Sequence, residues 1–139
     1  MKEGLITMTI KQVIVIRKDI NMRRGKAEAQ AAHASTMVFF ERSNILPNFS
    51  TGTKILHIPI TEEMEKWILG NYKKISVSCD SEDELNELYT KASNLNLPCS
   101  YIIDSGLTEF NGIPTPTCIA IGPANSEEID QITGHLKLR

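Results

Sequence analysis

Apolar residues recur at two different periods and divide the chain into predicted strands and helices. Residues 11–16 contain a continuous Val-Ile-Val-Ile run, which is typical of a strand buried on both faces. Residues 73–79 alternate apolar and polar positions, which indicates a strand with one buried face. Two further strands are predicted over residues 99–103 and 117–121, and a Gly-Pro pair is expected to stop the last one.

Helical spacing marks the segments between these strands. Small apolar residues recur at i, i+4, i+7 and i+11 and form one stripe that suits close packing on a sheet: Ala27, Ala31, Ala34 and Val38. The helix that carries them is predicted from its N-cap Asn21 to about residue 42. Three more helices are predicted: from Thr61 to about residue 69, from Ser81 to about residue 94, and from Asn125 to Gly134.

Residues 43–53 are rich in turn-forming types and are predicted to form a loop, followed by a short extended piece over residues 54–60. The order β-α-(α)-β-α-β-β-α favours parallel strands joined by right-handed crossovers. One antiparallel pair is expected, because no helix separates the last two strands. We therefore predict an α/β fold, a three-layer sandwich in which helices cover both faces of a four-stranded mixed β-sheet. Residues 1–10 are expected to form an N-terminal extension, and residues 11–139 a single domain.

Composition narrows the class of protein. The chain has 139 residues, of which 41% are hydrophobic and 23% charged, as in an ordinary soluble domain. No apolar stretch approaches the roughly 20 residues that span a bilayer, so we expect a cytoplasmic protein without a membrane partner. The three cysteines are far apart and odd in number, which favours buried free thiols in a reducing compartment: Cys79, Cys99 and Cys118.

The net charge of -2 means that overall charge does not attract polyanions. An anionic partner would have to bind a local patch, and residues 17–26 provide one, with a single acid among its cations: Arg17, Lys18, Arg23, Arg24 and Lys26. This patch lies at the predicted start of the first helix, where the helix dipole favours anions. A solvated charged surface without a ligand remains the alternative interpretation.

Candidate chemistry gathers at the carboxyl ends of two predicted strands, where open α/β sheets bind ligands. If the first and third strands are parallel neighbours, Asp104 lies near Lys26 and His33, which share one helix face with Gln30. A turn-forming role for Asp104 and a surface role for His33 are the alternatives. The other histidines have no ligand partners nearby, so we expect no metal site. Walker, dinucleotide-binding and nucleophile-elbow motifs are absent from the sequence.

Several of these residues belong to motifs that resemble the signature of the type 2, archaeal/eukaryotic-type peptidyl-tRNA hydrolases. The motifs occur in the following order: Gly25-Lys26-x-x-Ala29-Gln30-x-x-His33-Ala34, Asp104-x-Gly106-x-Thr108, Ile121-Gly122-Pro123, and Ile129-Asp130-x-Ile132-Thr133-Gly134-x-Leu136-Lys137-Leu138. The resemblance extends from about residue 11 to the C-terminus. It differs at Arg23-Arg24, where the family usually has Gly-Lys, and in the loop over residues 109–116. Residues 43–60 match no part of the pattern.

The resemblance implies hydrolysis of the ester that joins a peptide, or an N-blocked amino acid, to the 3′ ribose of tRNA, which recycles tRNA for translation. It implies a homodimer and no cofactor. Catalytic roles would fall to Lys26, His33, Asp104 and Thr108. Asp104 would orient or deprotonate water, while Lys26 would hold Asp104 or stabilise the oxyanion. His33 would shuttle a proton or contact the ribose. The substrate-binding residues would be Arg23, Arg24, Gln30, Gly106, Thr115 and Thr117.

Two other functions remain open on the sequence. The same fold with the same basic helix entrance would serve a non-catalytic module that binds tRNA or protein. The weak net charge also leaves room for an enzyme that acts on another small acyl ester or amide. Turnover of peptidyl-tRNA, set against binding of tRNA, distinguishes these functions.

Overall fold

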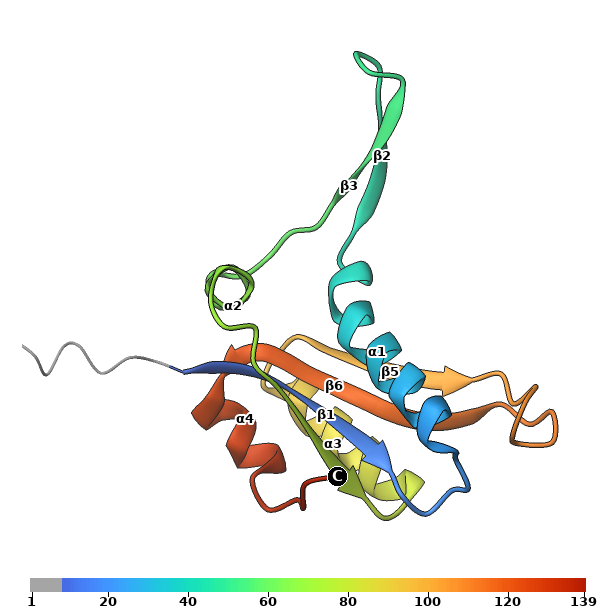
Figure 1. Cartoon of the computed structure of the whole chain (residues 1–139). Coiled ribbons are helices and arrows are strands. Elements are labelled where there is room, and N and C mark those ends of the chain that lie inside the picture. The colour runs from blue at the N-terminus through green and yellow to red at the C-terminus, as the bar shows by residue number, and fades with distance from the viewer. Residues whose placement is uncertain (1–8) are drawn as a thin grey trace, which may run out of the picture.

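The computed structural model describes residues 9–139, so most of the expected N-terminal extension lies outside the described residues. Helices cover both faces of a four-stranded sheet, and a separate two-stranded hairpin projects from it (Figure 1). The predicted three-layer α/β sandwich with a mixed sheet is confirmed. The elements are β1 (Ile10–Arg17), α1 (Arg24–Phe40), β2 (Asn44–Asn48), β3 (Thr53–His57), α2 (Glu62–Leu69), β4 (Lys74–Cys79), α3 (Glu82–Asn94), β5 (Cys99–Asp104), β6 (Thr115–Asn125) and α4 (Ser126–Thr133).

The strand order in the sheet is β4-β1-β6-β5. β1 pairs parallel with β4 and antiparallel with β6, and β5 pairs antiparallel with β6. The first and third predicted strands, β1 and β5, are not neighbours, because β6 lies between them. Both run antiparallel to β6, however, so their carboxyl ends still point to the same edge of the sheet.

The core has two halves, one on each face of the sheet. Leu85 and Leu88 of α3 pack with Ile129 of α4 against one face. Ala34 and Val38 of α1 pack against the other face, together with Met64 of α2. The alanine stripe predicted for α1 is buried there at Ala27, Ala34 and Val38, with Ala31 at its margin. All three cysteines are free thiols, two buried and one half-buried: Cys79, Cys118 and Cys99.

Three of the four predicted helix caps are confirmed. The side chain of Thr61 accepts from the Met64 N–H at 3.0 Å, and that of Ser81 accepts from the Glu84 N–H at 3.0 Å. Asn125 caps α4 by accepting from the Glu127 N–H at 2.8 Å. The predicted cap of α1 is wrong, because the N-cap is Arg23 rather than Asn21, and its side chain makes no cap hydrogen bond. In the described residues no helix is long and apolar enough to cross a bilayer.

The loop predicted over residues 43–53 is wrong, because most of that stretch forms the β2–β3 hairpin. The turn-forming residues occupy its tip, where Gly52 adopts a φ of +75° and donates its N–H to the Asn48 carbonyl at 3.0 Å. Nearly every residue of the two strands is exposed, so the usual burial pattern of a strand is missing. In Figure 1 the hairpin extends beyond the C-terminal end of α1, away from the sheet.

The last strand also differs from the prediction, because β6 continues through Gly122 and Pro123 to Asn125. Pairing with β1 extends β6 past Pro123, because Lys11 lies opposite Ala124 in the register. The C-terminal tail then lies along the outer edge of β4. The Lys137 carbonyl accepts a hydrogen bond from the Ser78 N–H at 3.0 Å. The Arg139 N–H donates to the Ser76 carbonyl at 3.1 Å.

Candidate active site

The first turn of α1 and the end of β5 meet at one cluster of polar side chains. The Lys26 Nζ lies 2.8 Å from Asp104 Oδ1 and 2.9 Å from Thr108 Oγ1. Both charged side chains are largely shielded, with 18% of Lys26 and 10% of Asp104 exposed. The cluster forms because α1 packs across β5 and β6, which brings its first turn beside the end of β5. Three of the four catalytic residues expected from the sequence therefore lie together.

Asp104 is held as a carboxylate from two sides. Its Oδ1 accepts from Lys26, with the Gln30 amide at 3.5 Å, and its Oδ2 accepts from the Gly106 N–H at 2.9 Å. The hydrogen bond from Lys26 is the largest cause that lowers the pKa of Asp104, and the Gly106 N–H and the nearby His33 act in the same direction. Partial burial opposes them without reversing the shift. Asp104 therefore carries its negative charge at neutral pH.

Lys26 keeps one donor for a ligand. An ammonium group has three N–H donors, and the described residues accept two of them, through Asp104 and Thr108. The third donor has no partner among the residues that the structure describes. A carbonyl oxygen placed beside this group would meet both a hydrogen-bond donor and a positive charge.

Gly106 determines the shape of the loop that carries Thr108. It has a φ of +82°, and a Cβ at this position would lie 2.2 Å from the Ile113 carbonyl oxygen. Its own carbonyl accepts from the Gly112 N–H at 2.8 Å, which closes the loop on itself. No residue with a side chain fits this close approach without moving the backbone. The loop therefore depends on Gly106 to place Thr108 over Lys26.

Gln30 and Thr117 lie beneath the cluster and are buried. The Thr117 hydroxyl donates to Gln30 Oε1 at 2.5 Å, and the Cys118 thiol donates to the Gln30 carbonyl at 3.2 Å. The bond from Thr117 fixes the side-chain amide so that its Nε2 faces Asp104, whereas the bond from Cys118 holds the backbone of Gln30. Of the residues expected to bind substrate, these two lie where they support Asp104 rather than where a ligand touches them.

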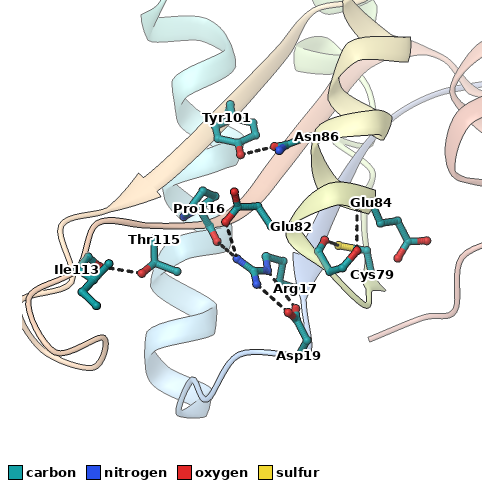
Figure 2. Close-up of polar contacts among 11 residues, drawn as sticks. Arg17, Asp19, Cys79, Glu82, Glu84, Asn86, Tyr101, Ile113, Thr115 and Pro116 are labelled. Carbon is teal, nitrogen blue, oxygen red and sulfur yellow. Dashed lines mark hydrogen bonds and ion pairs between the residues drawn. The ribbon is translucent and has the colours of Figure 1, made fainter.

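His33 and Thr115 lie at the margins of the cluster. His33 is exposed on the same face of α1 and lines a neighbouring cleft of about 600 Å³. Thr115 pairs with Asp104 across β5 and β6, but its hydroxyl donates to the Ile113 carbonyl at 2.8 Å. Figure 2 shows this hydroxyl turned into the loop. Within residues 9–139 no group of three acidic, histidine or cysteine side chains is arranged to hold a metal ion.

Arg17 lies in an internal network rather than on the surface (Figure 2). Only 8% of it is exposed, and its guanidinium donates to both oxygens of Asp19, at 3.0 and 2.7 Å. It also donates to the Pro116 carbonyl at 3.0 Å and approaches Glu82 at 3.5 Å. The hydrogen bond from Arg17 lowers the pKa of Asp19. The expectation that Arg17 belongs to an exposed basic patch is wrong, because these partners neutralise it.

The other cations of residues 17–26 also have carboxylates beside them, except one. Lys18 pairs with Asp80 at 3.3 Å, and Arg23 pairs with Glu109 at 3.5 Å. Arg24 makes no ion pair with a described residue, and it lines a cleft of about 580 Å³ beside α1. Carboxylates therefore neutralise most of the positive charge of residues 17–26, and Arg24 is the open cation, meaning that it has no ion pair with a described residue.

Glu109 is the functional candidate that sequence reasoning missed. Its side chain is only 13% exposed, and it accepts from the Arg23 backbone N–H at 3.2 Å. It thus supplies a negative charge to the N-terminus of α1, whose first turn contains no acid. No local signal marks it, because it lies 86 residues from Arg23 in an irregular loop.

Comparison with known proteins gives consistent results. Residues 10–139 match the sequence model of a family described as peptidyl-tRNA hydrolase PTH2. A peptidyl-tRNA hydrolase of Sulfurisphaera tokodaii is 43% identical over 131 residues, which cover 94% of this chain and 99% of that protein. A peptidyl-tRNA hydrolase of Methanocaldococcus jannaschii is 39% identical over 129 residues, with 93% and 99% covered. One of Aeropyrum pernix is 41% identical over 129 residues, with 92% and 94% covered.

Proposed function

This chain belongs to the peptidyl-tRNA hydrolase PTH2 family, and on that basis we propose how its Lys26–Asp104 site works. The protein is a hydrolase of peptidyl-tRNA. It cleaves the ester between a peptide, or an N-blocked amino acid, and the 3′ ribose, and so recycles tRNA for translation. The observation that carries the proposed mechanism is the shielded contact of Lys26 with Asp104 and Thr108. No observation on residues 9–139 favours the non-catalytic alternative.

Asp104 orients the attacking water. A carboxylate whose pKa is lowered by an ammonium group is a weak base, so its main contribution is to accept a hydrogen bond from water and fix its direction. Beyond the bond from Gly106, Oδ2 retains a lone pair for this purpose. The ester is already activated, so an aligned water is most of what the first step requires.

Lys26 stabilises the charge that develops on the ester carbonyl oxygen. As water attacks, this oxygen becomes negative, and the remaining ammonium donor of Lys26 binds it. The two bonds to Asp104 and Thr108 hold the ammonium group in place before the substrate arrives. Lys26 therefore contributes in two ways, through the Asp104 carboxylate and through the oxyanion.

His33 acts at the 3′ oxygen of the ester, where the ribose and the peptide diverge. It follows Lys26 by seven residues on the same face of α1, about 10 Å along the helix axis. At that distance it contacts the terminal ribose or passes a proton to the departing 3′ oxygen. Because the side chain is exposed, both roles are open to it.

The remaining candidates hold the site or bind the tRNA. Gly106 and Thr115 shape the loop beside the ester, while Gln30 and Thr117 fix Asp104 from below. Arginines at the start of α1 bind tRNA phosphates: Arg23 and Arg24. Arg24 is open, whereas phosphate must compete with Glu109 for Arg23.

A cytoplasmic homodimer completes the proposal, and it rests on the family resemblance. No membrane-spanning helix occurs in residues 9–139. Sedimentation of the purified full chain tests the oligomeric state: we expect one species of twice the chain mass, and a single species at the mass of one chain contradicts it.

The proposed function is tested with N-acetyl-aminoacyl-tRNA and free aminoacyl-tRNA as parallel substrates for the purified chain. We expect rapid cleavage of the blocked substrate and slow cleavage of the free one. Asp104→Asn should abolish most cleavage while tRNA binding, measured by filter retention, stays within about twofold. Binding of tRNA without any turnover by the wild-type chain would instead favour the non-catalytic module.

A further inference from the structure

Two apolar clefts adjoin at Phe40, near the C-terminal end of α1. The first, of about 600 Å³, has Met37, Phe40 and Ile102 among its lining residues. The second, of about 520 Å³, lies at the base of the hairpin and is lined by Ile45 and Leu56. Phe40 lines both clefts, so the clefts meet at this side chain and follow one another from the middle of α1 to the hairpin. We call these two clefts together the α1–β5 groove.

The α1–β5 groove begins beside the candidate active site. His33 lines it, and the β5 residues in its wall directly precede Asp104. The open basic residue Arg24 lies at the opposite end of α1. An ester bound at Lys26 therefore has the open cation Arg24 in one direction along the helix and an apolar groove in the other. A tRNA polyanion suits the first direction, and a peptide suits the second.

The backbone edge of β5 lies along the groove. It is an edge strand, with β6 as its partner strand among the described residues. Three consecutive β5 residues line the cleft: Tyr101, Ile102 and Ile103. Since successive side chains of a strand point to opposite faces, three in a row indicate that the strand edge itself forms the wall. An edge with unpaired N–H and C=O groups accepts an added strand of any sequence.

The hairpin extends the groove through one of its two faces. Ile45 lies opposite Leu56 in the hairpin register, and both contribute to the second cleft. The next pair, Leu46 and Ile55, belongs to the other face because side chains alternate along each strand. All four side chains are exposed, and a two-stranded hairpin is only marginally stable in water without further packing. An apolar chain lying along the Ile45–Leu56 face would provide that packing.

We propose that the α1–β5 groove binds the peptide part of peptidyl-tRNA as an extended strand beside β5, with the Ile45–Leu56 face of the hairpin contacting its distal residues. This inference rests on the proposed function. From Lys26 to Phe40 the helix rises about 20 Å, which corresponds to about six residues of extended peptide. Contact with the hairpin therefore requires a peptide of about six residues, while an N-acetylated single amino acid does not reach it.

The test compares hexapeptidyl-tRNA, whose distal residues are Leu and Val, with N-acetyl-aminoacyl-tRNA of the same tRNA. The readout is kcat/KM for hexapeptidyl-tRNA divided by kcat/KM for N-acetyl-aminoacyl-tRNA. This ratio cancels differences in the active fraction of each preparation. We expect a ratio of about ten for the wild-type chain and a fall to about one for the double variant Ile45→Ser/Leu56→Ser. The matched control Leu46→Ser/Ile55→Ser, on the other face, should keep the wild-type ratio.

Other outcomes separate the possible failures. A wild-type ratio near one, or equal losses of ratio in the two double variants, overturns the peptide groove and leaves the proposed function standing. A change of sedimenting mass in Ile45→Ser/Leu56→Ser at an unchanged ratio also overturns it, and assigns that face to a second copy. Failure to cleave either substrate contradicts the proposed function itself.

A second measurement addresses β5. Hexapeptidyl-tRNA with N-methyl groups on alternate amides cannot donate those N–H groups to the strand edge. We expect methylation in one alternating register to lower kcat/KM about tenfold and methylation in the other register to leave it nearly unchanged. Equal effects of the two registers overturn the strand addition.

Discussion

Residues 105–114 and the β2–β3 hairpin are both surface segments between regular elements, but they are held in opposite ways. The 105–114 loop has no regular structure, and contacts to distant elements fix it, through Thr108 to Lys26 and through Glu109 to Arg23. The hairpin has a complete backbone ladder, but its side chains, such as Phe49 at 93% exposed, contact little. The candidate catalytic contact therefore lies in the segment whose side chains are already fixed by distant partners, whereas the hairpin presents exposed side chains to which a ligand can bind.

The contact that anchors the 105–114 loop gives the largest expected effect. Lys26→Met keeps the aliphatic stem but removes the donors to Asp104, Thr108 and the ester. We expect kcat on N-acetyl-aminoacyl-tRNA to fall about 10³-fold, the range for loss of a catalytic charge. Lys66→Met removes an exposed ion pair to Glu62 and serves as the control, with less than a twofold change. A small loss in Lys26→Met would contradict the mechanism.

Two glycine substitutions in the 105–114 loop distinguish the effect of loop shape from the effect of losing a flexible residue. Gly106→Ala places a Cβ 2.2 Å from the Ile113 carbonyl oxygen, so the loop must move away from Lys26. We expect kcat to fall between about 10- and 100-fold, while the far-ultraviolet circular dichroism spectrum is retained. Gly112→Ala is the matched control, because Gly112 also has a positive φ, +75°, but no atom within 4 Å of its added Cβ. Equal losses of kcat in the two variants would refute the role of loop shape.

Salt dependence measures how far the acids near α1 compensate its basic entrance. With Arg24 open and Arg23 partly held by Glu109, log kcat/KM should fall with log salt at a slope between about -1 and -2, or roughly four- to tenfold between 50 and 200 mM. Arg24→Gln should reduce this slope by about one. Glu109→Gln should steepen it, because Arg23 is then released for phosphate. A slope that neither variant changes would place the tRNA contacts elsewhere.

The ion pair of Asp104 predicts a pH-dependent contribution to stability. The pKa of Asp104 is lowered from 3.8 in the folded chain by its bond to Lys26, so its stabilising contribution is present above pH 3.8 and is lost as the pH falls through the folded pKa. Wild type should therefore melt a few degrees above Asp104→Asn at pH 6. The difference in Tm should shrink below pH 4, and a difference that is constant with pH would contradict the assignment.

Removal of the hairpin should give the smallest effect on stability. Its residues lie outside both halves of the core, so replacing residues 44–57 by a short Gly-Ser linker removes little buried surface. We expect the Tm to change by less than about 3 °C in differential scanning calorimetry. A drop of more than 10 °C would mean that the hairpin stabilises the body of the protein.

Much of the fold was predictable because burial leaves a periodic pattern. The strands of the main sheet and all four helices are apparent from apolar spacing and caps. An extended piece was expected where β3 lies, but β2 and its pairing with β3 were missed because these strands are exposed, and Pro47 and Gly52 resemble loop residues when no apolar face constrains them. The course of β6 past Gly122 was missed because it depends on pairing with β1, a distant contact.

The site was predictable only in part. Lys26 meets Asp104 as expected, with Thr108 beside it, although β6 separates β1 from β5. The sequence does not distinguish an exposed cation from a buried one, so Arg17 was assigned to the surface. Its neutralising partners include Glu82, which is 65 residues away. The role of Glu109 could not be predicted from the sequence either, because only folding brings this distant residue to the start of α1.

The C-terminal tail has a consequence for association between copies of the chain. Residues 137–139 occupy the outer edge of β4, so the four-stranded sheet has one open edge, that of β5, within the described part of the chain. Two copies joined through β5 would leave no further edge on which a third sheet could grow. Edge-to-edge pairing of four-stranded sheets would therefore stop at two copies, because residues 137–139 already pair with the other edge strand, β4.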